Sequence, residues 1–176
     1  MKKIDKFIIL LGVLGFALWF GGTAIRYAIA YDLFQPGAEM DIKTWYPADV
    51  QMHVVFLFSM TIFYTSIGYG LATLAVIWIL VRFKHRLRNS GWLFMGSILF
   101  LLSLPAEGFL LYYDIHMNLA IGEGLETFNS PAVDDYFIFK LKDLGIVSSL
   151  SFLAALTSVI FFVWQPLEKK ETHDEG

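Results

Sequence analysis

The sequence predicts an all-α, polytopic membrane protein in which four transmembrane helices form a bundle, and two observations carry this prediction. Hydrophobic residues make up 57% of the 176 residues and charged residues only 16%, whereas roughly a quarter of the residues in soluble domains are charged. The charged residues are also gathered between four long apolar runs. Because a helix needs about 20 mostly apolar residues to cross a bilayer, each run is long enough to span it.

The first two predicted spans cover about residues 7–31 and 50–81. Arg26 is the only charged residue of the first span, and the second contains no Asp, Glu, Lys or Arg. The first run is too long for a cleaved signal peptide and no small-residue cleavage motif closes it before Arg26, so we expect a retained helix. The second run exceeds the thickness of a bilayer, which indicates a tilted or projecting helix.

The other two predicted spans cover about residues 92–113 and 144–164. Glu107 is the only charged residue of the third span, and the fourth has none. Upstream of the fourth span, Ser130 and Pro131 have the pattern of a helix start, with a capping side chain followed by proline in the first turn. We therefore expect helical structure to begin near Pro131, outside the membrane.

Small residues recur at a spacing of four in two of the spans. Ser66 is followed by Gly70 in the second, and Ser151 by Ala155 in the fourth. This spacing lets transmembrane helices approach closely, so we interpret both pairs as packing surfaces.

The distribution of basic residues predicts that both termini lie in the cytoplasm, because cytoplasmic flanks carry an excess of Lys and Arg. Three flanks on one side of a four-span layout hold Lys2, Lys3, Lys6, Arg82, Lys84, Arg86, Arg88, Lys169 and Lys170. The two long outer loops hold Asp32, Glu39, Asp41, Asp49, Glu123, Glu126, Asp134 and Asp135. We expect a multi-pass protein of a bacterial plasma (inner) membrane, with residues 1–167 as one transmembrane domain and 168–176 as a short cytoplasmic tail.

Two charged residues inside the predicted spans are the first candidates for function, since ionisable groups in a bilayer are costly. Arg26 and Glu107 each lie roughly 8–9 Å below the outer boundary at 1.5 Å per residue. Their equal depth predicts an intramembrane ion pair. The pair either locks the first and third spans together, or Glu107 binds a proton, an ion or a quinone headgroup.

Two histidines mark a second candidate site at the outer face. His53 begins the second span, one helical turn after Asp49, and His116 follows the third span, two residues after Asp114. Imidazoles and carboxylates are ligands for transition metals, and two histidines on facing helices can hold haem b. The alternative, which we favour, is that both histidines are interfacial and both acids solvated.

Composition excludes several classes of function. The chain has no cysteine, which rules out disulfides, thiolate metal sites and thiol redox chemistry. A net charge of −3 without a basic stripe argues against nucleic acid as a partner. The sequence also lacks phosphate-loop, zinc-peptidase and nucleophile-elbow motifs.

These observations favour a non-catalytic function. We expect a small integral subunit or accessory protein of a larger membrane assembly, with the lipid bilayer and other membrane or periplasmic subunits as partners. The alternative is a redox or transport module that uses an outer-face metal or haem site and the intramembrane Glu107. A membrane enzyme acting on lipid or quinone is the weaker alternative.

Overall fold

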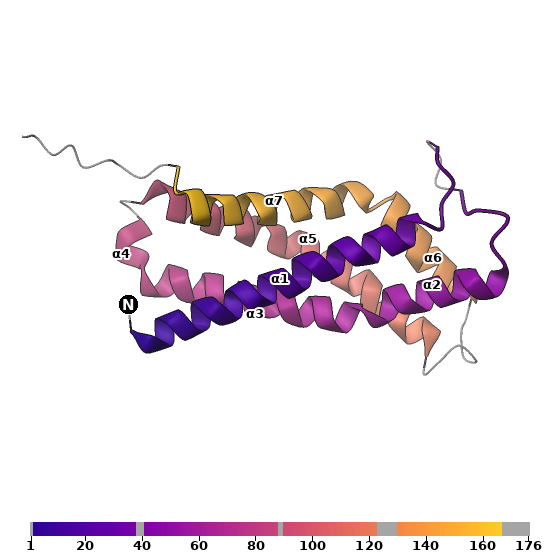
Figure 1. Cartoon of the computed structure of the whole chain (residues 1–176), viewed down its shortest axis with the longest axis horizontal. Coiled ribbons are helices and arrows are strands. Elements are labelled where there is room, and N and C mark those ends of the chain that lie inside the picture. Colours follow the sequence, from indigo (N-terminus) through magenta and orange to yellow (C-terminus); the bar gives the residue numbers. More distant parts are fainter. Residues whose placement is uncertain (1, 38–40, 88–89, 123–129, 167–176) are drawn as a thin grey trace, which may run out of the picture.

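The computed structural model describes residues 2–37, 41–87, 90–122 and 130–166, and these residues are mostly helical (Figure 1). The helices are α1 (Lys3–Tyr31), α2 (Ala48–Met60), α3 (Ile62–Arg82), α4 (Lys84–Leu87), α5 (Gly91–Ile121), α6 (Ser130–Lys142) and α7 (Gly145–Trp164). The described parts of the chain contain no strand, only an isolated antiparallel bridge between Phe34 and Ile42. The predicted all-helical class is confirmed.

Four helical stretches of the described chain are long and apolar enough to cross a membrane: Lys3–Tyr31, Ala48–Arg82, Gly91–Ile121 and Gly145–Trp164. They match the four apolar runs predicted from sequence. Large apolar side chains on them point outward, with Leu102, Ile146 and Val163 exposed by 66%, 74% and 78%. Apolar surface of this extent needs hydrocarbon around it, as in a multi-pass membrane protein.

The long helices pack as two pairs, α1 along α3 and α5 along α7, and the pairs meet between α3 and α5 (Figure 1). Glycine permits the close approach of α1 and α3, since a Cβ atom on Gly15 would lie 2.6 Å from the carbonyl oxygen of Gly68. In the second pair, the Ser158 hydroxyl donates a hydrogen bond to the Gly96 carbonyl at 2.6 Å. Small residues thus set both helix contacts.

The predicted small-residue surfaces have different outcomes. Ser151 and Ala155 are both buried on α7. On α3 the buried small residues are instead Gly68 and Ala72, whereas Gly70 is exposed. The packing surface of α3 is therefore displaced from the Ser66/Gly70 pair.

Two helix boundaries differ from the predicted ones. The third span continues as α5 to Ile121, two turns past its predicted end at Tyr113. The second span is interrupted at Thr61, between α2 and α3. There the carbonyl of Phe58 accepts hydrogen bonds from Nε of Arg26 at 3.1 Å and from the Thr61 hydroxyl at 2.9 Å. A side chain that captures a helix carbonyl disturbs the regular ladder.

The end of the molecule where α1 finishes has its own hydrophobic core, to which α6 contributes one face (Figure 1). Its buried members are Ala30, Leu33, Phe34, Val55, Phe58, Met117, Ile121, Val133, Phe137 and Leu141. We call this region the α6 end. The opposite end, where α1 begins and α4 lies, carries Lys3, Lys6, Arg82, Lys84 and Arg86, and we call it the basic end.

Some predictions fall on residues outside the described parts of the chain. They concern the tail at 168–176 and the charges of Glu39, Arg88, Glu123, Glu126, Lys169 and Lys170.

Candidate functional site

A buried cluster of charges lies between the helices near the α6 end. The guanidinium of Arg26 on α1 holds the Asp114 carboxylate of α5 through two contacts, Nη2–Oδ1 at 3.1 Å and Nη1–Oδ2 at 3.4 Å. The Lys140 ammonium of α6 pairs with the same carboxylate. All three side chains are at least 94% buried, so one carboxylate is shared by two cations inside the protein.

Arg26 also ties α1 to the interrupted second span. Besides the Phe58 carbonyl, its guanidinium contacts the Thr65 hydroxyl at 3.5 Å, and it lies 4.2 Å from the centre of the Phe58 ring. Arginine suits this position because its planar fork binds a carboxylate through two bonds and also stacks on an aromatic face. The Arg26 side chain therefore joins α1, α2, α3 and α5.

Lys140 is the least satisfied member of the cluster. An ammonium group has three donors, and among the described residues its hydrogen-bonding partner is Asp114 alone. The Phe58 ring lies 5.4 Å from Nζ. Burial lowers the pKa of Lys140 from 10.5 to about 8, opposed by the nearby Asp114 charge. Two donors of this ammonium thus remain for another acceptor.

The expected Arg26–Glu107 pair differs from the arrangement observed. Arg26 is paired with Asp114, while a Glu107 oxygen accepts a hydrogen bond from the Ser151 hydroxyl of α7 at 2.7 Å. Glu107 and Asp114 are seven residues apart, so they lie on the same face of α5, two turns from each other. Because α5 continues to Ile121, Asp114 is inside the helix packing rather than in a loop.

These groups meet at a cavity of about 430 Å³, which we call the polar cavity. Its charged lining residues are Arg26, Glu107, Asp114 and Lys140. The rest of the wall is apolar and aromatic, with hydroxyl groups interspersed: Trp19, Thr23, Tyr27, Thr65, Ser66, Tyr69, Gly70, Thr73, Leu74, Leu104, Gly108, Leu110, Leu111 and Ser148. The volume lies within the roughly 300–1,000 Å³ of small-ligand sites.

Two features suit the polar cavity to a ligand. The Thr73 hydroxyl is buried in the wall without a hydrogen-bond partner in the described chain. Gly70 of α3 and Gly108 of α5 also line the cavity, and a Cβ on either would meet no atom within 4 Å. Both glycines are exposed, so the cavity reaches the surface of the molecule between α3 and α5.

The structure does not bring the predicted outer His/Asp cluster together. Nδ1 of His53 contacts the Asp49 carbonyl at 2.7 Å, and Nδ1 of His116 contacts the Tyr112 carbonyl at 2.9 Å. Each imidazole is therefore bound to its own helix. Asp114, two residues before His116, points to the opposite side of α5 and into the charged cluster.

The four predicted donors also have different surroundings. His53 and Asp49 are exposed, Asp114 is buried, and His116 stacks on Tyr112 with ring centroids 4.1 Å apart. In the part of the chain that the structure describes, no three His, Cys, Asp or Glu side chains are placed to hold a metal ion.

Lys140 was not predicted as a site residue, although a signal for it exists. Val133, Phe137 and Leu141 are buried on one face of α6. Lys140 lies on the same face, because it follows Val133 by seven residues and Phe137 by three. A lysine at a core position of an amphipathic helix indicates a buried charge with a specific partner.

Comparisons of the chain with protein-family models, with curated proteins and with solved structures find no match.

Proposed function

We propose that the chain is a bacterial plasma-membrane protein whose four spans form a bundle with both termini in the cytoplasm. The basic end and the acidic outer loops support this orientation through the positive-inside rule. In a protein without native cysteine, Trp45→Cys is expected to react with an impermeant thiol reagent on intact cells, because Trp45 is 63% exposed. Lys84→Cys is expected to react only after lysis. Labelling of Lys84→Cys in sealed cells would refute the orientation.

We further propose that the polar cavity binds the headgroup of a quinone-type ligand that enters from the bilayer. Lys140 carries this proposal, since its buried ammonium has two donors free for acceptor oxygens. A quinone offers two carbonyl acceptors on a flat, uncharged ring. Neutrality matters because an additional unpaired charge is costly at this depth.

The walls of the cavity support the same class of ligand. Trp19 and Tyr69 present aromatic surface, with ring centroids 5.2 Å apart. The opening beside Gly70 and Gly108 faces lipid, where the apolar tail of such a ligand resides. Leu74, 64% exposed, lies at the rim. A quinone whose ring lies in the polar cavity and whose apolar tail lies in the lipid therefore matches the polarity of the site.

The test is the affinity of purified protein in detergent for decylubiquinone, measured by isothermal titration calorimetry. Lys140→Met is expected to weaken binding by about tenfold or more, since a charged hydrogen bond contributes about 1.5–3 kcal/mol and 1.4 kcal/mol corresponds to tenfold. The native affinity should also fall as the pH rises through about 8, where Lys140 loses its proton.

Lys142→Met is the matched control, because Lys142 lies on the same helix and is exposed. Equal affinities of the Lys140 and Lys142 variants would contradict the role of Lys140. Absence of saturable binding to the native protein would contradict the ligand class.

A second candidate function is that of an accessory subunit in a larger membrane assembly. The observation in its favour is the α6 end, where α6 and the segment after α1 complete a hydrophobic core together with the ends of the spans. Asp32 there accepts hydrogen bonds from Lys43 at 3.1 Å and Tyr46 at 2.9 Å, and the bond from Lys43 lowers the pKa of Asp32. Co-purification in mild detergent tests this function. Isolation of the chain without a stoichiometric partner would count against it.

A further inference from the structure

A second cavity lies at the basic end, and the proposed quinone site does not include it. Its volume is about 510 Å³, and its walls come from α1, α3, α5 and α7. The lining is apolar over most of its length, with Phe16, Val76, Phe100 and Phe162 among the residues that form it. We call this cavity the apolar slot.

Exposed apolar side chains of α1 and α7 flank the apolar slot. These helices touch near their middle, where the rings of Phe20 and Phe152 stack with centroids 4.5 Å apart. Nearer the basic end, Val13 of α1 and Val163 of α7 line the slot and are 60% and 78% exposed. Hydrocarbon chains of the surrounding lipid therefore have direct access to the slot.

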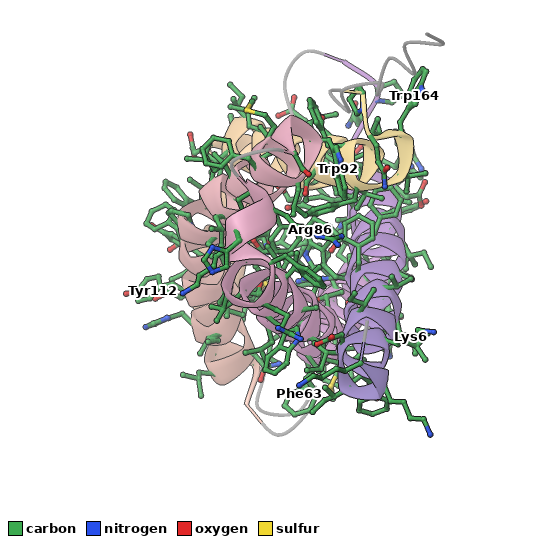
Figure 2. All side chains as sticks on the ribbon, turned by 90° about the vertical axis from the view of Figure 1, so that its left-hand side faces the viewer. Lys6, Phe63, Arg86, Trp92, Tyr112 and Trp164 are labelled. Carbon is green, nitrogen blue, oxygen red and sulfur yellow. The ribbon has the colours of Figure 1, made fainter. Side chains whose placement is uncertain are left out.

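One cation stands at the mouth of the slot. Arg86 of α4 lines it, and Figure 2, which looks onto this end, shows Arg86 near the middle of the end. Its neighbour Arg82 is already neutralised, because Nε lies 3.4 Å from the buried Asp5 carboxylate. Arg86, by contrast, makes no ion pair with any described residue.

We propose that the apolar slot binds one anionic phospholipid, with an acyl chain in the slot and the phosphate on Arg86. Charge complementarity selects this occupant: guanidinium groups bind phosphate oxygens through paired hydrogen bonds. Basic pockets between spans are known sites for anionic headgroups. The apolar lining of the slot accepts the acyl chain, while the contact with Arg86 selects the anionic headgroup.

The experiment is native mass spectrometry of the full chain, released from detergent micelles containing equal amounts of phosphatidylglycerol and phosphatidylcholine. The native protein is expected to retain one phosphatidylglycerol per chain. Arg86→Gln should reduce the retained fraction about tenfold, because a charged hydrogen bond to phosphate is lost. Lys84→Gln, a neighbouring exposed cation that does not line the slot, should leave the fraction unchanged.

A second variant tests the slot itself. Val159→Phe adds bulk to the α7 wall of the slot and should exclude the acyl chain while leaving Arg86 in place. Equal retention of the two lipids by the native protein, or undiminished retention in Arg86→Gln, would overturn the proposal, as would full retention in a folded Val159→Phe protein. Should Val159→Phe fail to fold, the exposed Arg86→Gln variant decides alone.

Discussion

The two ends of the protein enclose cavities of similar size between overlapping sets of helices, yet their linings have opposite character. Near the α6 end, the 430 Å³ polar cavity contains two cations and two carboxyl groups. At the basic end, the 510 Å³ apolar slot is lined by hydrocarbon, with Arg86 at its mouth. Helix packing thus provides both spaces, and the side chains that line them give the spaces their different polarity.

The two ends also differ in how they neutralise buried carboxylates. Asp114 is held by Arg26 and Lys140, all three of which are buried. Asp5 is buried as well, but its partner Arg82 is 44% exposed and remains solvated when the pair is broken. The same acidic residue type is therefore expected to contribute differently to stability at each end.

The largest expected effect is the loss of stability in Asp114→Asn. This variant removes the carboxylate that both buried cations contact, and breaking a buried pair costs about 3–5 kcal/mol. Asp5→Asn is the matched control, and it should lose much less stability because pairs with exposed partners contribute little. Thermal unfolding in detergent measures both. Equal losses of stability in the two variants would contradict the expected difference between the buried carboxylates of the two ends.

Much of the fold could be predicted because the spans are defined by length and hydrophobicity alone. The break at Thr61 could not, since it accompanies a tertiary contact: Arg26 of α1 reaches the Phe58 carbonyl. Likewise, the apolar run of α3 does not reveal which of its small residues face α1. Gly68 does, because it meets the backbone of Gly15.

The candidate site was predicted in part. The sequence predicts that Arg26 pairs with a carboxylate of the third span and points to Glu107, whereas in the structure the partner is Asp114. The predicted span ends at Tyr113, which leaves Asp114 just beyond it among solvated acids, whereas in the structure the helix continues for two more turns. Hydrophobicity marks where a span can end, but it cannot show that an acid beyond that point is neutralised by Lys140.

A ligand that occupies the polar cavity is expected to bind less well when the opening of the cavity is occluded, and this is the claim to test. In Gly108→Leu the new side chain starts in open space at the cavity wall, since a Cβ there meets no atom within 4 Å, and leucine favours the helix over glycine. Gly21→Leu is the control, because Gly21 also faces open space but does not line the polar cavity. Titration with decylubiquinone is expected to show affinity reduced by about tenfold or more in Gly108→Leu, equivalent to 1.4 kcal/mol, and native affinity in Gly21→Leu. Native affinity in a folded Gly108→Leu protein would contradict the claim.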